Sequence, residues 1–580
     1  MNVLGLSFMY HDSAACLLKD GIVVAAAAEE RFSRKKHSLD FPTGAIRSCL
    51  SLGDVPVDAL DAVVFYEKPL LKFERIVTMN SGAFPRGFAL FADAMPLWLK
   101  YKLFIREMIR TNLGYGGDVF FADHHYAHAS SAFFPSGFDE AAVLTMDGVG
   151  EWATMTRGRG EGNRIHLTHE LRYPHSLGLL YSTVTAFLGF RVNSGEGKVM
   201  GLSSYGNPTF RDRLLDRVID LRDDGSFRLN LDYFSFHRDL VMYSPRFVDE
   251  FGEPRKPESD ITARDEDLAC SLQDVVNTAC LNAAAHVGRE TGSRRLCIAG
   301  GVGLNSVANG RILEEGDFDE VFIQPASGDD GGAIGSALFY YHQVLGNPRR
   351  WHMEHAFLGS ADDPDEVQRF LDARGMPYRR FERTEDLVER AASDLARGRI
   401  VGWCRGRMEY GPRALGNRSI LASPTIDGMQ DVMNERVKHR ESFRPFAPAV
   451  LLERVGEFFD PPFGSPFMLL VARTRPDKKD VLGAVTHVDG TARLQTVDKT
   501  HNPRFHDLIA RFGETTGVPV LLNTSFNIRG EPIVRDCGDA LTCFLNTGID
   551  CLALEDCYLV KEEDPGDGKT RRLLPPLEWE

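Results

Sequence analysis

Residues 123–147 read DHHYAHASSAFFPSGFDEAAVLTMD and predict a short helix followed by a buried strand. The helix carries His124 and His128 four residues apart, so both imidazoles lie on one face. The apolar run from Ala141 to Met146 is typical of a buried strand, and it delivers Asp147 at its carboxyl end. Two imidazoles and a carboxylate are a suitable ligand set for a divalent transition metal.

A fourth ligand can come from the loop at residues 328–332, which contains Asp329 and Asp330 and opens another helix. Two other interpretations of the histidines stay open. His125 and His128 are three residues apart and would also share a helical face. The histidines would alternatively form a solvated patch beside unrelated acids, and spacing alone does not choose between these hypotheses.

Length and composition are those of a globular protein with more than one domain. The chain has 580 residues, which is too many for a single core. Its net charge of −15 argues against a surface for nucleic acid or for an anionic membrane. The ten cysteines include no C-x-x-C pair, so we expect neither a zinc ribbon nor a disulfide framework, and a cytoplasmic location fits best.

Two segments resemble targeting or membrane sequences only superficially. The N-terminus lacks a basic region before its apolar residues, so it predicts a strand and not a signal peptide. The apolar stretch at residues 87–105 contains Asp93, Lys100 and Lys102. A membrane span needs about 20 largely uncharged residues, so we expect this stretch to be a helix packed on a domain.

The predicted elements are those of a mixed α/β protein. In the first half we expect strands at residues 3–8, 14–18, 22–28, 63–66, 119–121 and 141–146. A long helix at about residues 267–290 precedes a strand, a glycine turn and a further helix. The turn-rich segment at residues 346–365 predicts the main boundary, which divides the chain into domains at 1–352 and 353–580. Beyond it we expect a helix at 384–397 and strands at 400–404, 518–522 and 552–560.

Two glycine-rich turns are candidates for contact with a nucleotide. Gly300–Gly303 lies between a strand and a helix start, where backbone amides can approach a phosphate. It is not a G-x-G-x-x-G motif, because Ser306 occupies the last position. Ser194–Lys198 is not a Walker A loop, because Val199 follows the lysine. Each turn alone is a weak signal, since glycine turns more often serve backbone geometry.

A basic cluster in the second domain is a stronger signal. Between Val401 and Val450 there are eight lysines and arginines against five acids, in a chain of net charge −15. Arg413 and Arg444 lie beside prolines in rigid turns, which a solvated charged face would not require. The cluster predicts an anion site, with a plain surface cluster as the alternative.

Nine motifs follow one another over nearly the whole chain. They are HDSA at 11–14, EERF at 29–32 with RKKH at 34–37, HxxxH at 124–128 with Asp147, GKVMG at 197–201, GGV at 300–302, GDDG at 328–331, EYGPRALGNR at 409–418, Lys438 with RPFAP at 444–448, and NTSFN at 523–527. Together they resemble the O-carbamoyltransferases, the family of the nodulation protein NodU and of the tobramycin and cephem carbamoyltransferases. No single motif would be sufficient for this resemblance.

The resemblance implies a fold and a reaction. The N-terminal domain is expected to be an actin-like ATPase (ASKHA) domain related to the tRNA threonylcarbamoyl transferases, and the C-terminal domain an α/β YrdC-like domain. The YrdC-like domain would use ATP to convert carbamoyl phosphate into carbamoyl-adenylate. The actin-like domain would then transfer the carbamoyl group to a hydroxyl of an acceptor.

The resemblance also implies site residues, carried over by position. The expected iron (Fe2+) ligands, for which Zn2+ or Mn2+ would also suit the donor set, are His124, His128, Asp147 and Asp329. The expected contacts to nucleotide or carbamoyl-adenylate are Lys36, Gly178, Gly301 and Asn305. The expected carbamoyl-phosphate residues are Arg413, Lys438, Arg444, Arg493 and Ser525. His11 is the residue we expect to act as base toward the acceptor hydroxyl.

Other functions fit parts of this pattern. An actin-like phosphotransferase of the sugar-kinase type would bind ATP, but the histidine–aspartate set and the arginine-rich second domain argue against it. A hydrogenase-maturation carbamoyltransferase would carry C-x-x-C zinc motifs, which are missing here. A non-catalytic nucleotide-binding regulator would tolerate the loss of metal ligands, yet all four candidates are present.

The expected partners follow from the carbamoyltransferase hypothesis. They are carbamoyl phosphate, ATP with Mg2+, and a hydroxylated small-molecule acceptor of the kind found in antibiotic biosynthesis. Neither nucleic acid nor a membrane is expected as a partner. The sequence leaves open the identity of the acceptor and the oligomeric state, including a homodimer.

Overall fold

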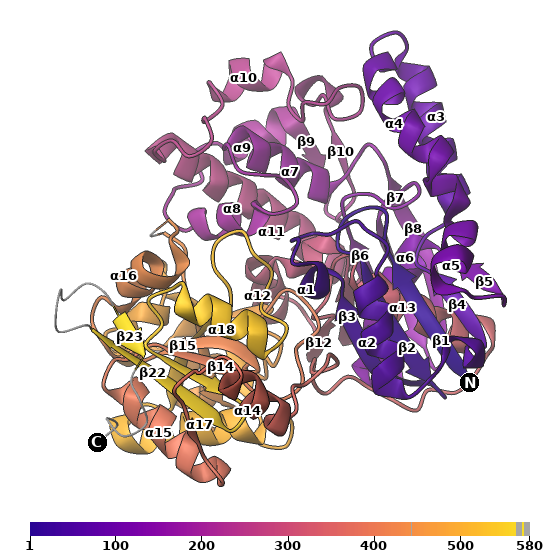
Figure 1. Ribbon diagram of the computed structural model, residues 1–580. Helices are drawn as coiled ribbons and strands as arrows, with labels where there is room; N and C mark the ends of the chain where they lie inside the picture. Colours follow the sequence, from indigo (N-terminus) through magenta and orange to yellow (C-terminus); the bar gives the residue numbers. More distant parts are fainter. Residues whose placement is uncertain (442, 564–570, 574–580) are drawn as a thin grey trace. The chain divides into compact units, whose positions relative to one another are not determined.

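The computed structural model describes residues 1–441, 443–563 and 571–573 (Figure 1). Contacts divide the chain into two compact units. Met1–Glu29 and His37–Met353 form the first, which we call the N-terminal unit. Glu30–Lys36 and the described residues from Glu354 onward form the second, the C-terminal unit. The short helix α1 (Glu30–Ser33) therefore groups with residues far along the chain.

The first sheet of the N-terminal unit has five strands in the order β3-β2-β1-β4-β5. β2 pairs antiparallel with β1 and β3, whereas β4 pairs parallel with β1 and β5. The strands are β1 (Asn2–Ser7), β2 (Ala14–Lys19), β3 (Ile22–Ala28), β4 (Ala62–Phe65) and β5 (Val119–Phe121). The five strands expected in this region are therefore confirmed, with ends that differ by one residue at most.

The second sheet repeats this topology. Its order is β12-β11-β6-β7-β8, with β7 antiparallel to β6 and β8, and β11 parallel to β6 and β12. The strands are β6 (Glu140–Met146), β7 (Ala153–Glu161), β8 (Arg164–Arg172), β11 (Arg295–Ala299) and β12 (Glu320–Ile323). Two sheets that each run in the order 3-2-1-4-5 form the duplicated architecture of an actin-like ATPase domain, as expected.

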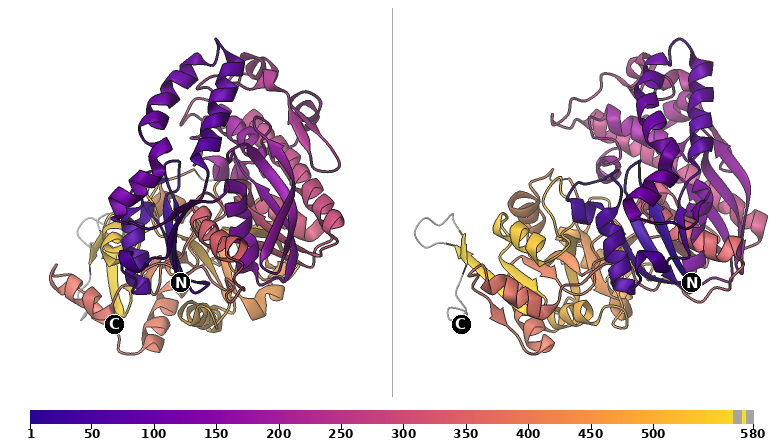
Figure 2. Two further views of the ribbon diagram at one scale, coloured as in Figure 1. Left: turned by 90° about the vertical axis from the view of Figure 1, so that its right-hand side faces the viewer. Right: turned by 45° about the vertical axis from the view of Figure 1, so that its right-hand side comes forward.

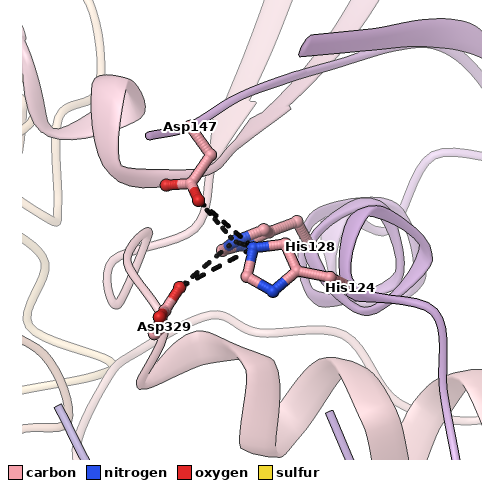
Figure 3. Close-up of side chains that lie close together, drawn as sticks. All are labelled: His124, His128, Asp147 and Asp329. Carbon is pink, nitrogen blue, oxygen red and sulfur yellow. Dashed lines mark hydrogen bonds and ion pairs between the residues drawn. The ribbon is translucent and has the colours of Figure 1, made fainter. Parts of the chain in front are cut away.

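Two helices between these sheets position the candidate residues. α6 (His124–Phe133) packs on β6 and β11, and α13 (Gly331–Leu338) packs on β1, β2 and α6. Gly335 allows the helices to approach, because a Cβ there would lie 1.8 Å from the carbonyl oxygen of Ala127. The start of α6, the end of β6 and the start of α13 consequently meet at one place (Figure 3).

Helices inserted between β4 and β5 form a separate layer. They are α3 (Pro69–Ala83), α4 (Phe88–Lys100), the 3-10 turn η2 (Lys102–Phe104) and α5 (Ile105–Leu113). Figure 2 shows α3 and α4 side by side. The single helix expected at residues 87–105 is wrong in its extent, because α4 ends at Lys100 and the chain turns before α5. Within the described ranges, no helix has both the length and the apolar character needed to cross a membrane.

A second insertion follows β8 and precedes the helices that return to the second sheet. It contains α7 (Leu177–Phe187), α8 (Glu196–Leu202), α9 (Arg211–Arg213), η4 (Leu214–Val218), β9 (Ile219–Leu221), β10 (Phe227–Leu229), η5 (Leu231–Tyr233) and α10 (Pro245–Phe251). The helices α11 (Ala263–Thr291) and α12 (Ser306–Glu315) flank β11 in the sequence, and η7 (Phe339–Val344) extends α13. The long helix expected at residues 267–290 is confirmed and begins one turn earlier, at the capping box of Thr262 and Asp265.

The C-terminal unit is built on one mixed sheet, in the order β13-β22-β21-β14-β15-β20-β16-β19-β18-β17, with β23 paired to β22. The strands are β13 (Arg379–Arg380), β14 (Val401–Cys404), β15 (Arg418–Ala422), β16 (Ala447–Leu451), β17 (Phe459–Asp460), β18 (Leu470–Thr474), β19 (Thr491–Val497), β20 (Val520–Ser525), β21 (Cys551–Leu554), β22 (Cys557–Glu563) and β23 (Arg571–Leu573).

Helices cover both faces of this sheet. One core packs α14 (Pro364–Asp372), α16 (Met429–Met433) and α18 (Cys537–Leu545) on the sheet, and the other packs α15 (Thr384–Ala396) and α17 (Pro503–Thr516) on it. The unit is therefore α/β, in agreement with the expected YrdC-like domain. The strand expected at residues 552–560 is in fact the hairpin β21–β22, whose turn at Glu555 and Asp556 contains neither glycine nor proline.

Candidate functional site

Four side chains of the N-terminal unit converge at the start of α6 (Figure 3). The Nε2 atoms of His124 and His128 lie 3.1 Å apart. Asp147, directly after β6, places its Oδ2 atom 3.2 Å from Nε2 of His124. Asp329, before α13, places its Oδ1 atom 3.6 Å from Nε2 of His128 and 3.8 Å from Nε2 of His124. One ligand atom from each residue lies within 4.8 Å of the others.

The geometry and burial of these residues fit a divalent metal ion. The side chains of His124, His128 and Asp329 are almost completely buried, and that of Asp147 is largely buried. Two imidazole nitrogens that face each other can share only one proton, whereas a cation about 2.0–2.2 Å from each donor would satisfy all four. The mixed nitrogen and carboxylate set suits Fe2+, Zn2+ or Mn2+.

The electrostatics of the cluster also favour a cation. Burial disfavours a charged His124, yet the carboxylates of Asp147 and Asp329 raise the pKa of this imidazole to about 9. The pKa of each carboxyl is lowered in turn, because the neighbouring histidines outweigh the effect of burial. Both carboxylates are therefore ionised at neutral pH and ready to hold positive charge.

His125 is excluded from the cluster. Its Nδ1 atom lies 2.7 Å from the hydroxyl of Thr145, and its Nε2 atom lies 2.8 Å from the carbonyl oxygen of Ala153. Burial and the neighbouring histidines lower its pKa to about 3, so the ring is neutral. Its hydrogen bonds to Thr145 and Ala153 connect α6 with β6 and β7 of the second sheet. The alternative that paired His125 with His128 is therefore wrong, as is the solvated patch, because all three rings are buried.

Several supporting residues were not predicted from the sequence. The carboxylate of Glu151 accepts the backbone N–H groups of His124 and Lys68, and so caps α6. Asp123 occupies the N-cap position but makes no side-chain cap. The Tyr66 hydroxyl donates to Asp329 over 3.4 Å. These contacts join segments far apart in the sequence, and no local spacing indicates them.

His11 lies beside the cluster, in the turn after β1. Its Nδ1 atom donates to Asp12 over 2.8 Å, and its Nε2 atom lies 4.0 Å from Oδ2 of Asp329. The other oxygen of Asp12 accepts from Nδ1 of His37 over 2.7 Å. Asp12 therefore fixes the orientation of His11. Burial disfavours a charged His11, but Asp329 and Asp12 raise the pKa of the imidazole well above its ordinary value.

Two of the expected nucleotide residues lie near Asp147. The Gly301 N–H donates to Asp147 over 2.9 Å, and a Cβ at Gly178 would lie 2.9 Å from the Asp147 carbonyl oxygen. Asn305 caps α12, and its amide exchanges hydrogen bonds with Gln273. Lys36 belongs to the C-terminal unit, where its charge contributes to lowering the pKa of Lys438.

The expected carbamoyl-phosphate residues gather in the C-terminal unit. Lys438 donates to the Ser525 and Asn527 carbonyl oxygens and to the Asn527 side chain. Burial, reinforced by Arg413 and Arg444, holds the pKa of Arg493 well below its ordinary value. The Nε atoms of Arg413 and Arg493 are buried and have no hydrogen-bond partner among the described residues. This group of cations lacks sufficient counter-charge, as expected for an anion site.

Hydrogen bonds hold the loop that carries Arg413. The Glu409 carboxylate accepts the backbone N–H groups of Leu415, Asn417 and Arg418. The Arg31 guanidinium donates to the Gly411 carbonyl oxygen over 2.8 Å. The loop that carries Arg413 is therefore fixed from both sides.

Arg440 joins this cationic group, although only its contribution to the basic composition was noted from the sequence. Burial and Arg444 lower its pKa to about 9, while Glu441 opposes the shift. Its guanidinium donates to the Asn434 side chain and lies 4.6 Å from the centre of the Phe446 ring. Arg440 adds to the positive potential and also supports the loop before β16.

Comparison with known proteins identifies the family. A family described as carbamoyltransferase N-terminus matches residues 2–338, and one described as carbamoyltransferase C-terminus matches residues 392–561. The chain is 47% identical to an uncharacterized protein of Synechocystis sp., over 97% of each chain. It is 38% identical to the nodulation protein NolNO of Sinorhizobium fredii, over 98% of this chain and 82% of the relative.

A further relative is named for a reaction. The chain is 28% identical to the 3'-hydroxymethylcephem-O-carbamoyltransferase of Amycolatopsis lactamdurans, over 95% of this chain and 98% of the relative. The resemblance inferred from the nine motifs is confirmed by these matches. The chain belongs to the carbamoyltransferase family and is an enzyme that transfers carbamoyl groups.

Proposed function

We propose that the C-terminal unit forms carbamoyl-adenylate from ATP and carbamoyl phosphate, and that the N-terminal unit transfers the carbamoyl group to a hydroxyl of a small-molecule acceptor. The observation that carries this proposal is the group of buried cations around Arg493, in which Nε of Arg413 and Nε of Arg493 have no hydrogen-bond partner among the described residues. A small dianion such as carbamoyl phosphate would supply the missing negative charge.

The proposed adenylation takes place in two steps. Water cleaves carbamoyl phosphate to carbamate and inorganic phosphate, and a carbamate oxygen then attacks the α-phosphorus of ATP and displaces pyrophosphate. Both steps build negative charge on phosphate oxygens. Fixed cations such as Arg413, Lys438, Arg444 and Arg493 stabilise that charge with little reorganisation, and Ser525 adds a hydroxyl beside Lys438. We expect Mg2+ to accompany ATP.

The N-terminal unit would carry out the transfer. His124, His128, Asp147 and Asp329 would hold Fe2+, with Zn2+ or Mn2+ as alternatives from the same donor set. When bound, such an ion supplies Lewis acidity toward an oxygen of the group being transferred. Gly178, Gly301, Asn305 and Lys36 would be contacts to the nucleotide or carbamoyl-adenylate.

With Asp329 engaged by the metal ion, His11 would be available in its neutral form and would take the proton of the acceptor hydroxyl. The hydroxyl oxygen attacks the carbamoyl carbon, the bond to the phosphate oxygen breaks, and AMP leaves with the electron pair. The hydrogen bond from Nδ1 of His11 to Asp12 leaves Nε2 as the nitrogen that accepts the proton. We infer that the acceptor is a hydroxylated natural product, of the kind that the name of the cephem relative describes.

Pyrophosphate release tests the proposal. The wild-type enzyme should release pyrophosphate from ATP only when carbamoyl phosphate is present. Arg444→Ala or Lys438→Ala should reduce this release strongly, since each removes a charge-assisted phosphate contact of on the order of 1.5–3 kcal/mol. The exposed Arg379→Ala provides a matched control in the same unit.

Supplying the intermediate separates the two reactions. Synthetic carbamoyl-adenylate should restore acceptor carbamoylation by Arg444→Ala and Lys438→Ala, detected as the mass gain of one carbamoyl group. Failure of the intermediate to restore product in folded variants would rule out the division of labour between the units.

A further inference from the structure

Three cationic side chains surround Tyr10 in the N-terminal unit. Lys72 and Arg75 come from α3, and Lys102 comes from η2. The Nζ atoms of Lys72 and Lys102 lie 4.8 Å and 5.6 Å from the centre of the Tyr10 ring. Only 4%, 7% and 8% of Lys72, Arg75 and Lys102 are exposed. Buried cations are rare in proteins unless an opposite charge accompanies them.

The counter-charge in this group is incomplete. Lys72 forms an ion pair of 2.5 Å with Glu67. Lys102 and Arg75 make no hydrogen bond or ion pair with any residue that the structure describes, and Nη1 of Arg75 is buried without a partner. Their contacts are with aromatic rings, Trp98 for Lys102 and Tyr173 for Arg75. The site therefore holds two cations that an anionic ligand can pair.

The lowered pKa values of Lys102 and Arg75 indicate that nearby negative charge does not fully balance these cations. Burial, helped by the charge of Lys72, lowers the pKa of Lys102 from 10.5 to about 8. Burial likewise lowers the pKa of Arg75, although Glu67 and Glu151 oppose it. A group that a complete ion pair stabilised would not be disfavoured in this way.

Neighbouring acids have other partners. Asp147 and Asp329 would be neutralised by the proposed metal ion, and Glu67 is taken by Lys72. Glu151 accepts the backbone N–H of His124 at the start of α6 and the backbone N–H of Lys68 before α3. With the metal bound, at least one positive charge near Tyr10 would remain without a protein counter-ion.

Tyr10 connects these cations with the proposed base His11. The rings of Tyr10 and His11 are 4.4 Å apart, and Tyr10 is 37% exposed, so solvent reaches this part of the unit. A molecule that brings a hydroxyl to His11 would pass over Tyr10 and meet Lys102 and Arg75. The apolar faces of Tyr10, Trp98 and Tyr173 would hold its carbon skeleton.

We propose that the acceptor of this enzyme carries an anionic group, a carboxylate or a phosphate, which binds Lys102 and Arg75 beside Tyr10 while its hydroxyl reaches His11. The inference rests on the proposed function and names the class of its acceptor. Charged hydrogen bonds in a desolvated site discriminate strongly against neutral analogues, because the buried cations then stay unpaired.

One sugar scaffold in four charge states tests this inference. Glucuronate, glucose 6-phosphate, glucose and glucosamine are offered separately with ATP and carbamoyl phosphate, and carbamoylated products are quantified by mass. We expect kcat/KM for at least one anionic sugar to exceed that for glucose by roughly 10- to 100-fold, with glucosamine slowest. The comparison of glucuronate with glucose 6-phosphate tells a carboxylate from a phosphate.

Variants of Lys102 show whether its charge is responsible. Lys102→Met keeps an apolar chain against Trp98, and should raise KM for the anionic sugar roughly tenfold or more while glucose is little affected. Lys102→Arg should retain the preference. Lys100→Met, which removes an exposed lysine from the end of α4, is the matched control and should behave as wild type.

The outcomes separate this inference from the proposed function. If the wild type releases no carbamoyl-phosphate-dependent pyrophosphate, the proposed function fails. If it releases pyrophosphate but carbamoylates glucose as well as the anionic sugars, or carbamoylates no anionic sugar, only the anionic acceptor is refuted. Equal losses for anionic and neutral sugars in Lys102→Met would mean that Lys102 is structural, which also overturns the inference.

Discussion

Replacing Arg413 with methionine should stabilise the free protein and at the same time weaken its binding of carbamoyl phosphate. Burial and the charge of Arg444 lower the pKa of Arg413 from the ordinary value of arginine to about 10. Both values lie above pH 7, so the guanidinium is charged in the folded and the unfolded chain. The folded state therefore bears the full free-energy cost of burying this charge. One pKa unit corresponds to about 1.4 kcal/mol, so this cost is at most about 3 kcal/mol.

Partial contact with solvent reduces that figure, and we expect Arg413→Met to raise the free energy of unfolding by about 1–2 kcal/mol. Urea unfolding monitors this gain, with the exposed Arg379→Met as the control. Carbamoyl phosphate should stabilise the wild type against urea and have little effect on Arg413→Met. A variant that is less stable than wild type without ligand, yet is still stabilised by carbamoyl phosphate, would refute the reasoning.

Four further predictions concern the N-terminal unit. Purified enzyme should bind about one divalent transition metal ion per chain, measured by elemental analysis. His128→Ala should lose this metal, whereas the control His169→Ala, which changes an exposed histidine, should keep it. Equal metal content in the two variants would contradict the ligand set. Metal binding at pH 7.5 should release protons, because the pKa of His124 is about 9 in the metal-free chain, and calorimetry in two buffers of different ionisation enthalpy should detect this release. Since that pKa is raised, the stability it contributes to the metal-free protein is complete below about pH 6.5 and is lost as the pH rises through 9; a flat profile over this window would contradict the ion pairs with Asp147 and Asp329. His11→Asn should slow acceptor carbamoylation roughly 10²–10⁴-fold while pyrophosphate release persists, and wild-type transfer rates would leave His11 without the role of base.

Local patterns predicted the centre of the metal cluster well. The spacing of His124 and His128 specifies one helical face, and the apolar run before Asp147 specifies a strand that ends there. Both statements depend on a few adjacent residues, which is why they could be made from the sequence. The first five strands were predictable for the same reason, since each is a short apolar run bounded by turn residues.

Contacts between distant segments could not be predicted in this way. Nothing near Glu151 indicates that its carboxylate caps α6, which begins 27 positions earlier. The hairpin at Glu555 was missed because its turn lacks the usual glycine or proline. The position of Asp329 in the cluster came from a family resemblance, because periodicity does not relate a loop to a helix some 200 residues away. The predicted domain limits at residue 352 stay a prediction.

The hydrogen bonds of Arg31 and Arg34 constrain how the chain can be made and divided. Arg31 donates to Gly411, and Arg34 donates to Ile533, across 380 and 499 positions of sequence. The ribosome makes these arginines 380 and 499 residues before their acceptors, so the C-terminal unit can be completed only after Ile533 has been made. A fragment that starts at Glu354 would lack Glu30–Lys36, which belongs to the C-terminal unit, and would therefore lack both donors.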